Sequence, residues 1–393
     1  MNITQLVTNI HPEVINWRRE LHKKPELSYN EFNTANYVAD LLTQFSAYEI
    51  SRPTPNSVVA RLIGNKPGNV LALRADMDAL PLTELNECDY KSQHNGVMHA
   101  CGHDGHSASL LGVAKILSQH KDELAGEVRL IFQHAEETPP GGAKELVDLG
   151  VLENVDMIIG IHLWSTMPIG KVGVIGGAMM AAPDVFNLEI KGKGGHGGFP
   201  HQAIDTITIG AQVVTNLQQI VARQINPLEP VVISVTKFIS GTTHNILPHT
   251  AEIAGTVRTF DNKVRHTIPE LMERIIRGIT SAHGADYAFN YTYGYDPVVN
   301  NHEVANFVEE VVVDTLGSGW VDKMAPNMAG EDFSAYLAKV PGCFIFVGAG
   351  NEEKGIIHPH HHPRFNIDED ALAVSMKIFL GAVAKYLGGN KCA

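Results

Sequence analysis

The stretch VRLIFQHAEE, residues 128–137, is an apolar run of strand length that ends in two adjacent carboxylates. A run with so few polar residues predicts a strand that is covered on both faces, which is typical of parallel sheets. Further apolar runs at residues 70–74 and 157–161 alternate with segments of helical spacing at residues 107–119 and 144–149. Strands that alternate with helices predict an α/β fold with a mainly parallel sheet.

Polar side chains lie just beyond the ends of the predicted strands, at Asp76, Glu136, Glu137 and His162. Open α/β sheets collect their ligands beyond the carboxyl ends of the strands. Neighbouring residues at a strand end point to opposite sides, so one carboxylate of the Glu136–Glu137 pair can bind a metal ion while the other faces an attacking water. A solvated acidic turn is the alternative for this pair taken alone.

The segment MHACGHDGH, residues 98–106, places a thiol and three imidazoles close together. Thiolate and imidazole are the usual ligands of first-row divalent ions, and the two glycines allow a tight turn that aims Cys101 and His103 at one point. A histidine-rich surface loop is the alternative for this segment alone. A second histidine cluster, HPHHHP at residues 358–363, adds potential ligands. Together with the polar strand ends, these segments predict a metal site.

Composition restricts the class of protein. A length of 393 residues favours two domains, and the net charge of -13 argues against a nucleic-acid partner. The chain has no apolar run near the ~18 residues of a membrane helix and no signal-peptide pattern at its start, so we expect a cytoplasmic protein with no membrane partner. The four cysteines, Cys88, Cys101, Cys343 and Cys392, are too few for a disulfide framework. Cys101 is therefore expected to be a free thiol.

A different order of elements begins near residue 184. Strands and helices follow one another as β-α-β-β-α-β, at residues 185–191, 204–222, 231–238, 251–259, 264–283 and 288–293. This is the split ferredoxin-like arrangement, and about 110 residues are enough for an independent domain. We therefore expect a catalytic, metal-binding domain formed by residues 1–182 and 294–393, and an inserted domain formed by residues 183–293.

The sequence resembles the dinuclear-metal amidohydrolase family of N-acyl-amino-acid aminoacylases, hippurate hydrolases and auxin-conjugate hydrolases, which is related to the zinc carboxypeptidases and dipeptidases. The matching stretches run nearly end to end: WRRELH (17–22), PELS (25–28), RADMDALP (74–81), 98–106, QHAEE (133–137), GGHGGFPH (194–201), HNILP (244–248), GTVR (255–258), GEDF (330–333) and HHPRF (361–365). The resemblance implies cleavage of the amide bond of N-acyl-L-amino acids by a metal-activated water. It also implies that the inserted domain is a lid and a dimerisation surface, so that we expect a homodimer or a higher homo-oligomer.

The resemblance further implies that two divalent metal ions are held by Cys101, His103, Glu137, His162 and His361. A thiolate favours zinc, whereas carboxylate and imidazole also suit manganese, nickel or cobalt. Glu136 would be the general base and then the general acid. The family's ligand in the second cluster is the histidine two places before the proline, which selects His361, although spacing alone does not separate it from His358, His360 and His362. His99 and His106 are expected to be structural or to support a ligand.

One departure from the wider clan concerns Asp76-Met77-Asp78, which stands where the clan has a His-x-Asp ligand motif. The histidine ligand is therefore absent, and Cys101 and His103 compensate for it in the aminoacylase branch. Asp78 would orient a ligand or the base by hydrogen bonding. Its alternative role is an N-cap for a following helical turn.

In the lid, the resemblance implies that His196 donates to the oxyanion of the tetrahedral intermediate. Asn245 and Arg258 would bind the free carboxylate of the substrate, a task that suits the bidentate guanidinium. Closure of the lid is expected to complete the site. A dipeptidase or carboxypeptidase, an N-acetyl-diamino-acid deacetylase and a non-catalytic metal-binding protein are the alternatives, and Glu136 argues against the last. The acyl group is not specified, with Met179, Met180 and Phe333 as candidates for its pocket.

Overall fold

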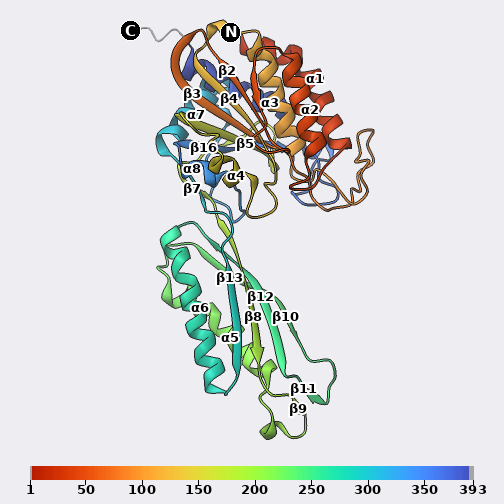
Figure 1. Cartoon of the computed structure of the whole chain (residues 1–393), viewed down its shortest axis with the longest axis vertical. Helices are drawn as coiled ribbons and strands as arrows, with labels where there is room; N and C mark the ends of the chain where they lie inside the picture. Colours follow the sequence, from red (N-terminus) through yellow and green to blue (C-terminus); the bar gives the residue numbers. More distant parts are fainter. Residues whose placement is uncertain (1, 389–393) are drawn as a thin grey trace. The chain divides into compact units, whose positions relative to one another are not determined.

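The computed structural model describes residues 2–388, which leaves Cys392 outside the described part (Figure 1). The chain divides into two compact units. Unit 1 takes in the described parts of residues 1–177, 299–325 and 332–393, and unit 2 takes in residues 178–298 and 326–331. The borders thus fall at 177/178 and 298/299, where the sequence predicted 182/183 and 293/294. The short segment 326–331 belongs to unit 2, although the sequence analysis assigned it to the catalytic domain.

Unit 1 contains an eight-stranded sheet in the order β1-β2-β4-β3-β5-β16-β6-β15. Its strands are β1 (Glu49–Ser51), β2 (Val58–Ile63), β3 (Lys66–Asp76), β4 (Ala125–Gln133), β5 (Met157–Pro168), β6 (Val172–Gly173), β15 (Val321–Asp322) and β16 (Gly342–Gly350). The four central strands β4, β3, β5 and β16 are parallel. This arrangement confirms the predicted α/β fold with a mainly parallel sheet.

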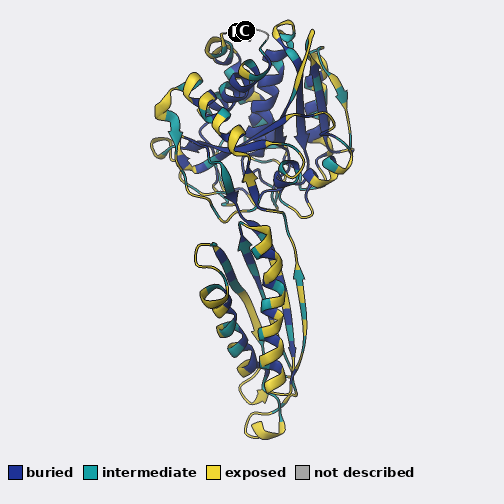
Figure 2. Cartoon of the chain, turned by 90° about the vertical axis from the view of Figure 1, so that its left-hand side faces the viewer, coloured by how far each residue is buried: buried dark blue, intermediate teal, exposed yellow. Residues whose placement is uncertain are grey.

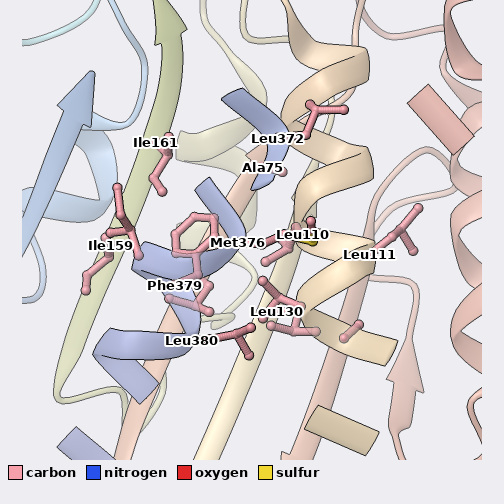
Figure 3. Packing of buried hydrophobic residues seen from close by; sticks show 14 of the residues in the cluster. Ala75, Leu110, Leu111, Leu130, Ile159, Ile161, Leu372, Met376, Phe379 and Leu380 are labelled. Atoms are coloured by element: carbon pink, nitrogen blue, oxygen red, sulfur yellow. The ribbon is translucent and has the colours of Figure 1, made fainter. Parts of the chain in front are cut away.

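Helices cover this sheet and bury its apolar side chains. They are α1 (Ile3–Lys23), α2 (Phe32–Gln44), α3 (His103–Ser118), α4 (Gly142–Asp148), α7 (His302–Leu316), α8 (Ser334–Leu337) and α9 (Asp370–Leu387). Figure 3 shows the packing between the sheet and two of the helices, where Ile159 and Ile161 of β5 face Leu110 of α3 and Phe379 and Leu380 of α9. Strand β16 is buried along its whole length and β4 along all but its first residue, because both faces of the sheet are covered.

Two elements of unit 1 differ from their predicted bounds. Helix α3 begins at His103 and not near residue 107, so the Cys101 loop runs directly into the helix through Gly102, whose φ of 93° suits a glycine. Strand β5 continues to Pro168, because it remains paired with β16 up to the pair formed by Pro168 and Gly350. His162 therefore lies inside a strand and not beyond its end.

Unit 2 is built from β8 (Ala182–Lys191), α5 (Thr206–Gln219), β10 (Val231–Ser240), β12 (Thr250–Thr259), α6 (Asn262–Ala282) and β13 (Asp286–Thr292). Its antiparallel sheet has the order β10-β12-β8-β13, which is the split ferredoxin-like arrangement. Asp205 caps α5 and Asp261 caps α6, because each carboxylate accepts hydrogen bonds from backbone N–H groups at the start of its helix. Figure 2 shows that α5 and α6 turn exposed faces outward and buried faces toward the sheet.

Four short strands complete the fold: β7 (Gly177–Met180), β9 (Gly195–His196), β11 (Ile246–Leu247) and β14 (Val298–Asn300). Strands β9 and β11 pair with each other in unit 2. Cys88, Cys101 and Cys343 are free thiols, which confirms the prediction made for Cys101. Within residues 2–388, no helix is both long and apolar enough to cross a lipid bilayer.

The packing of α9 against the sheet contributes to the apolar core of unit 1. Replacing the fully buried Leu380 with alanine should lower the free energy of unfolding by about 2–5 kcal/mol, because the variant loses apolar contacts and leaves a cavity. Urea denaturation followed by circular dichroism measures this change. Leu149→Ala is the matched control, since the Leu149 side chain is 54% exposed and should shift the free energy by less than about 0.5 kcal/mol. Equal effects of the two substitutions would contradict the packing described.

Candidate metal centre

The five predicted metal ligands of unit 1 lie in one cluster. Cys101, His103 and Glu137 offer donor atoms within 4.8 Å of one another. The Sγ atom of Cys101 lies 3.4 Å from Nε2 of His162. The Nε2 atom of His361 lies 3.2 Å from Oε1 of Glu137. Segments from four distant parts of the chain therefore bring sulfur, nitrogen and oxygen donors to one place.

Two of these donor atoms are buried and form no hydrogen bond in the described part of the chain, namely Nε2 of His103 and Oε1 of Glu137, although Nε2 of His361 lies within ion-pair distance of the latter. They lie 4.0 Å apart. Buried polar atoms are normally hydrogen-bonded, so two neighbouring metal-donor atoms without hydrogen bonds require an explanation. A divalent cation between imidazole nitrogen, carboxylate oxygen and the Cys101 thiolate would supply the missing partner. The residues present therefore fit a metal ion.

The orientation of His103 is fixed by Asp78. The Nδ1 atom of His103 lies 2.9 Å from the backbone oxygen of Asp78 and 3.2 Å from its Oδ1, so this nitrogen donates and Nε2 faces the cluster. Burial lowers the pKa of His103, but the carboxylates of Asp76 and Asp78 outweigh burial and raise the pKa to about 10. A cation that binds at Nε2 therefore displaces a proton.

The peptide group of Leu163 orients three imidazoles at once. Its carbonyl oxygen accepts from Nδ1 of His162 and from Nε2 of His360, both at 3.0 Å. Its N–H donates to Nε2 of His106 at 2.8 Å. The first of these bonds leaves Nε2 of His162 facing Cys101. Burial holds the pKa of His162 well below its usual value, so this imidazole is neutral and able to bind a cation.

The second histidine cluster contributes two residues to this region. His361 has a left-handed backbone, with a φ of 63°, and its N–H donates to the carbonyl of Ala100 at 2.8 Å. His360 is packed against His162 and Trp164, and it forms a candidate metal-ligand group with Cys101 and His162. The sequence analysis selects His361 and not His360, whose place in the same histidine cluster is the available sequence signal for it. The rings of His358 and His362 stack on each other at 4.3 Å.

Asp78 joins three segments around the cluster. Besides its contact with His103, its Oδ2 accepts from the Ser28 hydroxyl at 2.7 Å and from the N–H of Glu137 at 3.0 Å. The next helix, α3, begins only at His103, so the alternative prediction of an N-cap role for Asp78 is wrong. The geometry agrees with the prediction that Asp78 orients a ligand.

Asp76 and His106 lie beside His103, with which they form a further group of potential metal ligands. Oδ1 of Asp76 accepts from Nδ1 of His106 at 2.6 Å, and Oδ2 accepts from Arg74 at 2.6 Å. Both ring nitrogens of His106 are therefore engaged, which suits a structural role. His99 is buried, neither of its ring nitrogens has a partner within the described residues, and burial lowers its pKa to about 4.

Glu136 and Glu137 lie on the same side of the site. Oε2 of Glu136 is 3.9 Å from Nε2 of His103, and Oε1 of Glu137 is 4.0 Å from the same atom. The sequence analysis expected the two side chains to point to opposite sides, as they would in a strand. Strand β4 ends at Gln133, and Ala135 has a φ of 51°, so the alternation of a strand no longer applies. Both carboxylates can thus serve one centre.

The candidates for an acyl pocket are core residues. Phe333 has no exposed surface and packs against Phe344 and Arg74. Met179 is fully buried and Met180 is 2% exposed. These three side chains are buried in this structure, so it gives no support to the prediction that they line an acyl pocket.

The predicted lid residues form two separate groups within unit 2. His196 in β9 pairs with Ile246 of β11, directly after Asn245, and both predicted residues are exposed. They line a cavity of about 770 Å³. Arg258 lies elsewhere, where β12 pairs with Pro183 of β8, and its Nε donates to the carbonyl of Met328 at 3.0 Å.

The separation between these groups follows from the length of β12. Eight residue steps from Thr250 to Arg258 span roughly 26 Å at ~3.3 Å per residue. Asn245 precedes Thr250, so it lies still further from Arg258 along the chain. The structure therefore does not bring Asn245 and Arg258 together within one copy of unit 2, although both were predicted to bind the same carboxylate.

A parallel α/β sheet that gathers a thiol, imidazoles and carboxylates at one edge defines a protein of the metallohydrolase class. The sequence model of Peptidase family M20/M25/M40 matches residues 72–385, and the chain belongs to this family. An N-acyl-L-amino acid amidohydrolase of Geobacillus stearothermophilus is 59% identical over 301 residues, which are 77% of this chain and 81% of the relative. Thermostable carboxypeptidase 2 of Saccharolobus solfataricus is 43% identical over 98% of both chains.

A solved structure extends the comparison to the fold. A Bacillus subtilis protein described as a dinuclear metal binding peptidase from the M20 family matches with a TM-score of 0.83 and 36% identity. The match covers 96% of this chain and 99% of that chain. These findings confirm the resemblance that the sequence motifs indicated and identify the protein as a hydrolase of this family.

The donor set makes a spectroscopic prediction. Cobalt(II) added to the metal-free protein should produce a sulfur-to-cobalt charge-transfer band, because the Cys101 thiol lies among the nitrogen and oxygen donors. Cys101→Ser should lose this band, and Cys343→Ser should keep it, since Cys343 is buried beside the Phe344 carbonyl and belongs to no candidate metal group in the described chain. Ultraviolet absorption during titration measures both. A band that survives Cys101→Ser would exclude Cys101 as a ligand.

Proposed function

We propose that the chain hydrolyses the amide bond of N-acyl-L-amino acids and that two divalent metal ions assist the reaction. The observation that carries this proposal is the pair of buried metal-donor atoms without hydrogen bonds in the described chain, His103 Nε2 and Glu137 Oε1, with the Glu136 carboxylate 3.9 Å from the same imidazole nitrogen. The name of the Geobacillus relative supports the substrate class, and the description of the Bacillus structure supports two metal ions.

The metal ions would be held by Cys101, His103, Glu137, His162 and His361, with zinc, manganese, nickel or cobalt as candidates. When bound, the ions would lower the pKa of a water molecule and polarise the amide carbonyl. His162 and His103 are already oriented for binding by Leu163 and Asp78. A thiol ligand must remain reduced, which supports the cytoplasm as the location.

Glu136 would accept the proton of the attacking water and pass it to the leaving amine. Its position beside Glu137 supports this role, because one residue can bind metal while the adjacent one remains within reach of the same centre. His196 would stabilise the oxyanion, and Arg258 would bind the free carboxylate of the amino acid.

Substitution of the proposed base tests this assignment. Glu136→Gln should lower kcat by about 10²–10⁴-fold and leave the metal content unchanged, because the amide cannot accept the proton. Steady-state hydrolysis of N-acetyl- and N-benzoyl-amino acids, together with metal analysis, measures both quantities. Glu303→Gln, on the exposed side of α7, is the control and should retain full activity. A Glu136→Gln variant with wild-type kcat would refute the role, and a metal-loaded wild type that cleaves none of these substrates would refute the function.

A carboxypeptidase activity is the second candidate, favoured by the 43% identity to the archaeal carboxypeptidase over 98% of the chain. Both reactions cleave an amide bond next to an amino acid with a free carboxylate, so the proposed Arg258 contact would serve either. A parallel screen of N-acyl-amino acids and dipeptides separates the two. Higher kcat/KM for the dipeptides would favour the peptidase.

We also propose that two copies of the chain build each complete site. In one bound substrate, the oxyanion on the acyl carbon and the free carboxylate of the amino acid are only a few ångströms apart. His196 and Arg258, in contrast, lie near opposite ends of the unit 2 sheet. A single copy of unit 2 therefore cannot present both side chains to one substrate. A homodimer in which one copy supplies His196 and Asn245, and the other supplies Arg258, resolves this conflict.

Complementation between two inactive variants tests the shared site. His196→Ala and Arg258→Ala should each lose most activity alone. Mixed under conditions that exchange subunits, half of the dimers become hybrids with one intact site, and activity should return to about a quarter of the wild-type value. Steady-state assays of the mixture and of each variant measure this recovery. No recovery despite verified hybrid dimers would contradict the shared site.

A further inference from the structure

The segment from Ser28 to Glu31 lies against the loop that carries Glu136 and Glu137. The sequence motif PELS ends at Ser28, and the proposed function leaves it without a role. This segment lies between α1 and α2, whereas the loop connects β4 to α4. Three side chains of the segment contact the loop. Glu31 contacts it before the two glutamates, Ser28 just after them, and Tyr29 at Thr138 and Gly141.

The Glu31 carboxylate holds the residue that precedes Glu136. It accepts from the N–H of Ala135 at 2.7 Å and from Nδ2 of Asn56 at 2.9 Å. Glu31 has no exposed surface, and burial together with the charge of Asp78 raises its pKa to about 7. Ala135 has a φ of 51°, a left-handed conformation that is strained for alanine. A buried carboxylate thus fixes a strained turn directly before the proposed base.

The Tyr29 hydroxyl holds the far end of the loop. It donates to the carbonyl of Thr138 at 3.2 Å and accepts from the N–H of Gly141 at 3.1 Å. Both hydrogen-bonding roles of the hydroxyl are therefore used by the loop backbone. Tyr29 itself has a left-handed backbone, with a φ of 67°. The segment and the loop each contain a residue with a left-handed backbone, Tyr29 and Ala135, which indicates that surrounding interactions fix the geometry of both.

The Ser28 hydroxyl connects the loop to Asp78. It donates to Oδ2 of Asp78 at 2.7 Å and accepts from the Thr138 hydroxyl at 3.0 Å. The same Oδ2 accepts from the N–H of Glu137, and the other side of Asp78 accepts from His103. Ser28 is thus one hydrogen bond from Asp78 and two hydrogen bonds from two of the proposed metal ligands, His103 and Glu137.

We propose that Ser28, Tyr29 and Glu31 form a clamp that fixes the direction in which Glu136 and Glu137 leave β4. The clamp residues are positioning residues, because they act through Ala135, Thr138, Gly141 and Asp78. The inference rests on the proposed function, in which Glu137 binds metal and Glu136 moves the proton. Without the clamp, the loop backbone between Ala135 and Gly141 would lose the bonds on both sides of the two glutamates.

Two conservative substitutions with matched controls test the clamp. Tyr29→Phe removes one hydroxyl, and Tyr48→Phe is its control, because the Tyr48 hydroxyl also donates to a backbone carbonyl, that of Ala114 in α3. Glu31→Gln removes one charge, and Glu26→Gln is its control, because the Glu26 carboxylate accepts from Asn33 and Thr34 near the start of α2. The controls should lower thermal stability but leave catalysis and metal binding unchanged.

The clamp variants should lower kcat with little change in KM and should weaken metal binding, both within about 10–100-fold for Glu31→Gln and somewhat less for Tyr29→Phe. Glu31→Leu should be worse than Glu31→Gln, because glutamine still offers an oxygen to the N–H of Ala135. Zinc affinity is measured on the full-length protein by competition with a chromophoric chelator, well below the melting temperature of each variant.

The metal titration keeps this test separate from the proposed function. If the wild type binds zinc but cleaves no N-acyl-amino acid, the proposed function fails and the zinc affinities still decide on the clamp. Clamp variants with zinc affinity within twofold of the wild type would overturn the proposal. Effects equal to those of Tyr48→Phe and Glu26→Gln would also overturn it, because they would reflect general stability alone.

Discussion

Parallel pairing of β4, β3 and β5 imposes the central constraint on this protein, because it delivers polar side chains to one edge of a buried sheet. Asp76 ends β3 with no exposed surface, and His162 on β5 is 4% exposed. Charged and polar groups at such a place are costly unless each one finds a partner. The buried partners that surround this edge are therefore as much a part of the site as the groups proposed to bind metal.

Two buried arginines supply much of this compensation. Arg74 contacts Asp76 and also Asp332 of the GEDF motif, at 2.6 and 2.9 Å. Arg18 of the WRRELH motif contacts Asp104, at 2.7 Å, in the first turn of α3. Although burial raises it, Arg18 and His22 hold the pKa of Asp104 far below its usual range. Arg18 and Arg74 are far apart in sequence, yet Asp104, the partner of Arg18, and His106, which contacts the Arg74 partner Asp76, both lie at the start of α3.

Local patterns were sufficient to predict the parallel sheet, the ferredoxin-like order of unit 2 and the clustering of Cys101 with the strand-end residues. Features that depend on pairing or backbone conformation were not predictable. The length of β5 is set by its partner β16, and the common direction of Glu136 and Glu137 is set by the left-handed backbone of Ala135. His360 packs against His162 and Trp164, whereas His361 lies beside Glu137. The spacing of the histidines in the sequence does not encode this difference in orientation. The separation of Asn245 from Arg258 was not predictable either, because it depends on how far β12 runs along β8.

Because unit 2 interrupts unit 1, the central sheet combines strands made early and late during translation. Strand β16 lies between β5 and β6, although residues 178–298 separate its part of the chain from theirs. A nascent chain that has just completed unit 2 therefore still exposes an unpaired edge of β5, an arrangement prone to association with other chains. Unit 2 has its own apolar core, and all of its core residues precede β16 in the sequence. Insertion of β16 is then the event that closes the sheet.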